Sequence, residues 1–169
     1  RGVRGGQVWI IAYHHDGHLL WERNTNLPAA GGWDGSTLHV PLLCWDVNAD
    51  GRTEVVYHSH VGRYPHAIHG VPSDGSRLTA VDGATGEPVW EAPWPSVQPR
   101  VMMTVGHLNG LDRPTSIVVQ DETYRNVVLT AVNGATAETD WRVEQERAGG
   151  HNLDIADIDG DGVQEVICG

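Results

Sequence analysis

The chain has 169 residues and a formal net charge of −11, because 22 acidic residues outnumber 11 basic ones. A surface this acidic repels phosphate groups and argues against a nucleic-acid partner. Every apolar run falls short of the about 18 residues that a transmembrane helix requires, so we expect no membrane span. The basic residues are all Arg, which excludes Lys as a catalytic base within this sequence.

The first repeated unit is a hairpin that carries a Trp. Each copy reads as a strand, an Asp-Gly or Asn-Gly turn and a short strand ending in Trp, and these turns supply the positive φ values of tight hairpins. The copies are residues 11–21, 79–90 and 130–141. Long loops rich in Gly, Pro and His are predicted at 21–36 and 57–75.

The second repeated unit alternates with the first and is a loop with oxygen-bearing side chains at every other position. Two copies begin at Asp46 and Asp157, each with Gly at its sixth position and a β-branched stretch after its final Glu. Alternate oxygens and the carbonyl at position 7 can supply most of the about six to eight ligands of Ca²⁺. The predicted ligands are Asp46, Asn48, Asp50, the Arg52 carbonyl, Glu54, Asp157, Asp159, Asp161, the Val163 carbonyl and Glu165.

The flanking strands distinguish these loops from an EF-hand, whose loop lies between helices. A solvated Asp/Gly turn is the alternative, but repetition of the pattern in the same strand context favours Ca²⁺. A degenerate relative at 105–119 has lost the regular carboxylates, and we expect it to bind no metal.

Alternation of the two hairpins predicts an all-β fold. One hairpin of each kind forms a four-stranded sheet of about 50 residues, which is the size of a β-propeller blade. The chain then holds two full and two half blades. Because propellers close with about four to eight blades, we expect residues 1–169 to be part of one propeller domain, truncated at both ends, with the rest of the same propeller chain as its partner.

A segment rich in His, Tyr and Arg follows the first calcium loop. His58 and His60 come directly after the loop's strand, and His39 begins the preceding strand. Loops at one end of a propeller channel gather around a shared pocket, so this segment is a candidate pocket rim. Ordinary surface His residues are one alternative, and a zinc site is another. The zinc ligands would be His58, His60, His66 and His69.

Three segments of the chain form an ordered pattern. Residues 8–21 lead to the first calcium loop, residues 121–131 carry a Tyr-Arg pair before a strand, and residues 149–162 place a His before the second loop. In this order they resemble the catalytic domain of β-propeller rhamnogalacturonan lyases over nearly the whole chain. The chain departs from that family's pattern at His58, where the family has Lys, and at His39, where it has an aromatic residue. Ulvan lyase propellers are the second resemblance.

The resemblance implies a calcium-loaded propeller that cleaves an acidic polysaccharide by β-elimination. Such a reaction needs a neutralised uronate carboxylate, a base for the C5 proton and an acid for the O4 leaving group. His and Tyr suit the proton transfers, and Arg suits bidentate binding of a carboxylate. The predicted catalytic residues are His39, His58, His60, Tyr124 and Arg125. The predicted substrate-binding residues are Arg63, Tyr64, His151 and Asn152.

We therefore expect a secreted or cell-surface polysaccharide lyase that acts on a rhamnogalacturonan-type glycan, with mainly structural Ca²⁺ as its cofactor. Two other classes stay open. One is a non-catalytic, calcium-stabilised propeller for adhesion or carbohydrate binding. The other is a quinone-dependent dehydrogenase, whose propeller repeat the Trp hairpins also resemble.

Overall fold

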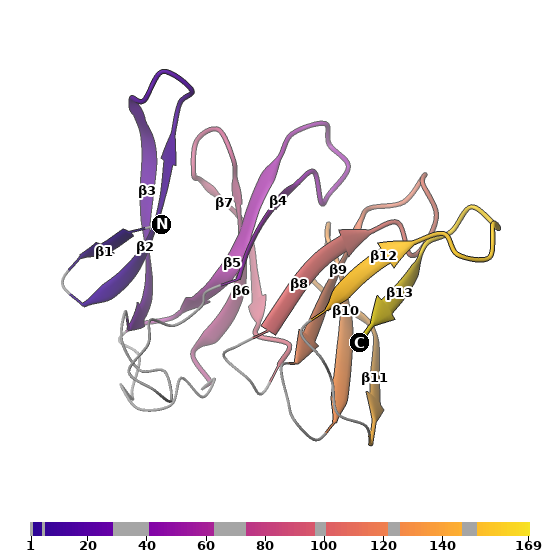
Figure 1. Ribbon diagram of the computed structural model, residues 1–169. Helices are drawn as coiled ribbons and strands as arrows, with labels where there is room; N and C mark the ends of the chain where they lie inside the picture. Colours follow the sequence, from indigo (N-terminus) through magenta and orange to yellow (C-terminus); the bar gives the residue numbers. More distant parts are fainter. Residues whose placement is uncertain are drawn as a thin grey trace.

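The computed structural model describes residues 2–4, 6–28, 41–62, 74–96, 101–121, 126–146 and 152–169, and these contain strands and turns but no helix (Figure 1). The strands are β1 (Gly2–Arg4), β2 (Gln7–Tyr13), β3 (Leu19–Pro28), β4 (Leu42–Trp45), β5 (Glu54–His60), β6 (Ser76–Asp82), β7 (Pro88–Pro93), β8 (Val101–Gly106), β9 (Ser116–Asp121), β10 (Val127–Asn133), β11 (Thr139–Gln145), β12 (Leu153–Ala156) and β13 (Glu165–Cys168).

The strands form antiparallel sheets that follow one another along the chain (Figure 1). Two sheets have four strands, in the orders β4-β5-β6-β7 and β8-β9-β10-β11. A three-stranded sheet β1-β2-β3 precedes them, and a two-stranded sheet β12-β13 follows. Each four-stranded sheet joins one loop hairpin to one Trp hairpin, so the predicted all-β propeller fold is confirmed. That residues 1–169 belong to one domain truncated at both ends stays a prediction.

Apolar side chains fill the space between successive sheets. Val55 and Tyr57 of β5 pack with β2 and β3 in one cluster, whereas Val56 packs with residues of β6, β9 and β10 in a second cluster. Successive side chains of a strand point to opposite faces, so β5 contributes to the core on both sides. All seven residues of β5 are buried, whereas the outer strands β7 and β11 are mostly exposed.

Several strands are longer than the sequence pattern predicts. The strand after each turn does not end at its Trp, because β3, β7 and β11 continue beyond it. Residues 21–28 and 57–60, predicted as parts of loops, lie in β3 and β5. The partner strands account for the difference: β6 pairs with β5 as far as His60↔Ser76, and β2 pairs with β3 as far as Gln7↔Pro28. Cross-strand pairing sets these lengths, and local composition does not reveal it.

The second and third Trp hairpins need their turn Gly for a reason other than the predicted positive φ. In the second hairpin positive φ falls on Gly86, at 72°, and not on the Gly of the Asp-Gly pair. A Cβ atom on Gly83 would lie 2.5 Å from the Thr53 carbonyl oxygen, and one on Gly134 would lie 2.2 Å from that of Val47. The prediction of positive φ is therefore wrong at both positions. Gly is required because another backbone segment approaches too closely for a side chain.

The turns that join β2 to β3, β4 to β5, β6 to β7 and β12 to β13 lie along one edge of the molecule, at the top of Figure 1. Strand β5 starts at this edge, directly after the first predicted calcium loop, and ends at His60 on the opposite side. At about 3.3 Å per residue, Glu54 and His60 lie about 20 Å apart along the strand. The first predicted calcium loop and His60 are therefore too far apart to bind one metal ion.

Candidate functional site

Hydrogen bonds from the backbone to side-chain oxygens shape the first predicted calcium loop. Asp46 accepts the N–H of Asp50 at 3.1 Å and, through its other oxygen, the N–H of Gly51 at 2.9 Å. Asp50 in turn accepts the N–H of Arg52 at 2.9 Å. Ala49 and Gly51 adopt positive φ values of 63° and 86°, which turn the chain sharply and bring alternate oxygens together.

The second loop repeats this arrangement. Gly162, at a φ of 89°, donates its N–H to Asp157 Oδ2 at 3.0 Å. The N–H of Ile158 donates to Glu165 Oε2 at 2.8 Å. One ligand atom from each of Asp157, Asp159 and Glu165 lies within 4.8 Å of the others. Two loops that share little beyond the ligand pattern thus have the same local geometry, as expected if the pattern itself determines the backbone.

The final Glu of the first loop has an unsatisfied oxygen. Glu54 is fully buried, and its Oε2 accepts the Val47 N–H at 3.0 Å. Its Oε1 is also buried and has no hydrogen-bond partner among the described residues. Burial, with the negative charges of Asp50 and Asp46, raises the pKa of Glu54. A buried carboxylate oxygen without a donor is costly unless a cation neutralises it, so this oxygen-only donor set fits Ca²⁺.

The first loop is also tied to its neighbours. The Arg52 guanidinium forms a 3.0 Å ion pair with Asp82, at the end of β6. Backbone N–H bonds from the following turn, chiefly that of Thr85, lower the pKa of Asp82. The Thr115 hydroxyl of the next sheet donates to the Asp46 carbonyl at 3.3 Å. Ordering the loop therefore orders contacts with two further elements.

The His pair of β5 lies on one face of the strand, as alternation predicts, but both side chains are buried. His58 is 2% exposed and stacks on Trp94 with ring centroids 4.1 Å apart. Burial, and secondarily the charge of His60, lowers the pKa of His58 to about 3. His58 Nε2 is buried without a hydrogen-bond partner among the described residues. His60 is 7% exposed, and its ring occupies the space beside Gly75 where a Cβ atom would collide.

Most of the other predicted site residues fall outside the part of the chain that the structure describes. These are His39, Arg63, Tyr64, Tyr124, Arg125 and His151, together with His66 and His69 of the zinc alternative. Asn152 is described and exposed, and its backbone pairs with Gly169 at the open end of the β12-β13 hairpin. Convergence of the predicted catalytic and substrate-binding residues on one groove stays a prediction.

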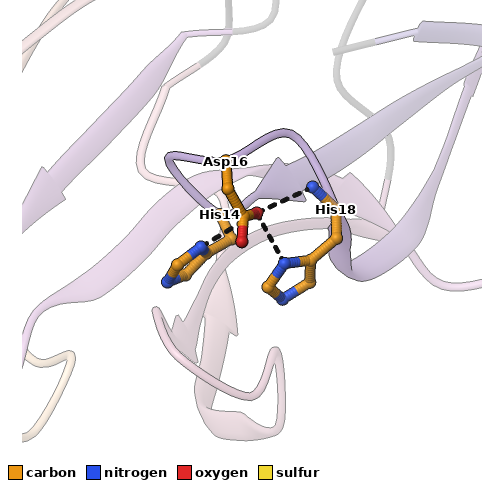
Figure 2. A group of neighbouring side chains, drawn as sticks. All are labelled: His14, Asp16 and His18. Atoms are coloured by element: carbon orange, nitrogen blue, oxygen red, sulfur yellow. Dashed lines mark hydrogen bonds and ion pairs between the residues drawn. The ribbon is translucent and has the colours of Figure 1, made fainter.

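One group of metal-ligating side chains was missed in the sequence. His14, Asp16 and His18 meet at the turn between β2 and β3 (Figure 2). The signal that could have found it is the alternate spacing His-X-Asp-X-His across a hairpin turn. The sequence pattern predicts only a turn there, because Asp16-Gly17 accounts for the hairpin by itself.

The repeated four-stranded sheets and their Asp loops define a β-propeller protein. The chain belongs to the FAM234A/B beta-propeller family, whose model matches residues 39–168. The chain is also similar to the rhamnogalacturonan endolyase YesW of Bacillus subtilis (strain 168), at 26% identity over 97% of this chain and 32% of that protein. The rhamnogalacturonan exolyase YesX of the same organism is 25% identical, over 97% of this chain and 32% of that protein.

Solved structures agree on the fold. The crystal structure of rhamnogalacturonan lyase YesW superposes with a TM-score of 0.76 at 24% identity, covering 97% of this chain and 34% of that chain. The rhamnogalacturonan lyase PL11 of Bacillus licheniformis superposes with a TM-score of 0.75 at 23% identity, covering 97% of this chain and 34% of that chain. The resemblance to rhamnogalacturonan lyases found in the sequence is confirmed.

The chain spans about a third of the length of these curated relatives, 32% in both cases. Among the described residues, no helix has the length and hydropathy needed to cross a membrane. The family model is described by its propeller, and not by an activity.

Proposed function

We propose that this chain is part of a polysaccharide lyase that cleaves a uronate-containing, rhamnogalacturonan-type glycan by β-elimination. The observation that carries the proposal is sequence similarity over 97% of the chain to two proteins named as rhamnogalacturonan lyases. Identities of 26% to the endolyase and 25% to the exolyase are nearly equal, so the proposal covers internal and terminal cleavage alike.

The reaction defines what the residues must do. A base takes the C5 proton, the electron pair of the C5–H bond forms a C4–C5 double bond, and the C4–O4 bond breaks as an acid protonates O4. Neutralising the uronate carboxylate lowers the barrier, because negative charge develops beside it. We assign these steps to the predicted catalytic group, His39, His58, His60, Tyr124 and Arg125. Arg63, Tyr64, His151 and Asn152 are proposed to bind the neighbouring sugars.

The burial of His58 bears on its role in this reaction. A base works best when its pKa lies near the working pH, and the pKa of His58 is lowered to about 3 by burial. His58 is therefore a weak base in the free protein, although its neutral imidazole can still donate a hydrogen bond. The base is then sought among the remaining members of the group.

Each calcium loop is proposed to bind one Ca²⁺ through the ligands predicted from the sequence. When bound, the ion supplies positive charge that holds the loop carboxylates together. Glu54 contributes the oxygen that lacks a partner among the described residues, and the loop backbone presents the carbonyl of the seventh position. The first loop lies about 20 Å along β5 from His60, so we propose a structural role for the ion that it binds. A secreted or cell-surface location, where Ca²⁺ is abundant, suits such sites.

The test uses the intact protein that contains these blades. It is incubated with rhamnogalacturonan, with unbranched polygalacturonate and with ulvan, and unsaturated uronate is followed by its ultraviolet absorbance. We expect product only from rhamnogalacturonan. Product from ulvan alone would show that the substrate is ulvan and not rhamnogalacturonan. Absence of product from every uronate-containing glycan would overturn the lyase proposal.

A calcium-stabilised propeller that binds carbohydrate without cleaving it is the competing proposal. The burial of both described His residues of the predicted catalytic group favours it. Glycan binding by the same intact protein, measured by calorimetry, separates the two. Saturable binding of rhamnogalacturonan without unsaturated product would support the binding function over the lyase.

A further inference from the structure

The turn between β2 and β3 gathers three side chains that can bind a metal ion. His14, Asp16 and His18 each offer one ligand atom, and these atoms lie within 4.8 Å of one another (Figure 2). Both imidazoles approach the same carboxylate oxygen: Asp16 Oδ1 lies 3.0 Å from His14 Nδ1 and 2.6 Å from His18 Nδ1. One ligand atom from each of the three side chains thus lies close enough to the others to share a small cation.

The backbone holds this group in place without the metal. The N–H of His14 donates to the His18 carbonyl, and the N–H of Gly17 donates to the His14 carbonyl, both at 2.9 Å. Gly17 has a φ of 92°, which closes the turn. The N–H of His18 also donates to Asp16 Oδ1 at 3.1 Å. A preformed turn lowers the entropy cost of gathering ligands.

The Asp16 carboxylate is the partner of both ring nitrogens. His14 Nδ1 is shielded from solvent and pairs with Asp16 Oδ1 at 3.0 Å (Figure 2). The side chains as a whole remain accessible, with 39% of His14, 55% of Asp16 and 58% of His18 exposed, so an ion can reach them from solvent.

We propose that His14, Asp16 and His18 form a binding site for a divalent transition-metal cation of the Zn²⁺ class. Imidazole nitrogen suits Zn²⁺, Ni²⁺ and Cu²⁺, whereas Ca²⁺ and Mg²⁺ prefer oxygen alone. The site is thereby chemically distinct from the two Asp loops. Three protein ligands leave the fourth tetrahedral position open to water.

The required adjustment is small. Ligands bound to Zn²⁺ at about 2.0–2.1 Å in a tetrahedron lie about 3.3 Å from one another. The Nδ1 atoms must therefore withdraw from Asp16 Oδ1 by less than about 1 Å from their present 3.0 Å and 2.6 Å. The rings of His14 and His18 are stacked, with centroids 4.5 Å apart, and must rotate apart as the ion enters. Exposed side chains can rotate in this way without disturbing a core.

His15 provides a matched control within the same turn. It is exposed, and its ring lies beside that of His14 with centroids 4.0 Å apart, but it is not part of the ligand group. Zn²⁺ alone is titrated into the full chain by calorimetry with Ca²⁺ in excess, for the wild type and for H18Q, D16N and H15Q. We expect the site's affinity to fall by about tenfold or more in H18Q and D16N. We expect it to change by less than about twofold in H15Q.

Two results would overturn the proposal. One is equal Zn²⁺ affinity and stoichiometry in the wild type and the H14Q/H18Q double variant, which would leave a surface cluster that binds no metal. The other is a loss in H15Q as large as that in H18Q, which would mean unspecific binding to His. A ¹⁵N NMR titration of the wild type with Zn²⁺ tests the site without any substitution. Adding Zn²⁺ must shift the Nδ1 signals of His14 and His18 and leave those of His15 unchanged.

Discussion

The Trp90 indole N–H donates a 2.8 Å hydrogen bond to the Gly134 carbonyl and so joins β7 of one blade to the β10-β11 turn of the next. One blade earlier, Trp21 makes the same bond to the Gly83 carbonyl at 2.9 Å. The repeated Trp is therefore more than an apolar filler. Trp21 and Trp90 each connect their sheet to a turn of the next sheet, and the Gly at the acceptor lies close to the neighbouring backbone.

Replacing Trp90 by Phe should weaken the contact between the two blades. The ring still packs, but the Gly134 carbonyl loses its donor, so we expect a loss of about 1–2 kcal/mol in the free energy of unfolding. Unfolding W90F and the wild type in denaturant measures this difference in the free energy of unfolding. Trp141, for which the described residues supply no such bond, is the control, and W141F should change stability by less than about 0.5 kcal/mol. Equal losses in both variants would show that the hydrogen bond contributes nothing specific.

Replacing Gly134 by Ala should destabilise the fold strongly, although it adds only one methyl group. The new Cβ would lie 2.2 Å from the Val47 carbonyl oxygen and 2.5 Å from that of Thr115. Backbone atoms on both sides cannot move aside cheaply, so we expect destabilisation of about 3 kcal/mol. Thermal unfolding measures the effect. G169A meets no atom within 4 Å and is the control; a G134A variant as stable as G169A would contradict the close approach.

Removing Ca²⁺ should lower the melting temperature of the intact protein. At a free Ca²⁺ concentration about 100 times the Kd, each site adds about 2.7 kcal/mol to the folded state. E54Q removes the charge of a ligand while keeping an acceptor for the Val47 N–H, and it should lose one bound Ca²⁺. D112N, in the degenerate loop, should keep both bound Ca²⁺ ions. Calcium content and melting temperature unchanged by a chelator would exclude the calcium proposal.

Stability should fall in mild acid because of His58. Its pKa is about 3 in the folded chain against an ordinary 6.5, so between these pH values the unfolded state binds a proton that the folded state does not. The contribution of neutral His58 to the free energy of unfolding is complete above pH 6.5 and is lost as the pH falls towards 3. Within this range the equilibrium constant for unfolding rises about tenfold for each pH unit. H58F, which can still stack on Trp94, should flatten this dependence. H15Q, at an exposed position, should leave the slope unchanged.

Alanine substitutions in the intact protein test the proposed catalytic assignments. Loss of a true base or acid should lower kcat by about 10²–10⁴ with little change in binding, whereas loss of an Arg that holds the carboxylate should impair both. The substitutions are H39A, H58A, H60A, Y124A and R125A. Y13A, at an exposed position of β2, is the control. If all five kept kcat within about threefold of the wild type, the catalytic groups would belong to other blades.

Local patterns predicted the parts of this molecule whose geometry is contained in a few neighbouring residues. The Asp loops follow from ligand spacing, because hydrogen bonds such as Gly51 N–H to Asp46 and Gly162 N–H to Asp157 close within the loop itself. The blades follow from the alternation of two hairpin types, because antiparallel neighbours are consecutive in sequence.

Strand lengths, glycine roles and the state of the histidines were decided by contacts between distant segments. The sequence marks His58 as a chemically active residue beside a loop, yet the ring stacks on Trp94 inside the fold. Burial, and secondarily the charge of His60, lowers the pKa of His58 to about 3. It marks Gly134 as a turn former, yet the Val47 backbone is what excludes a side chain there. Local hydrogen bonding and spacing are properties of a short segment. Burial and close approach arise only when sheets pack, and only the tertiary structure reveals them.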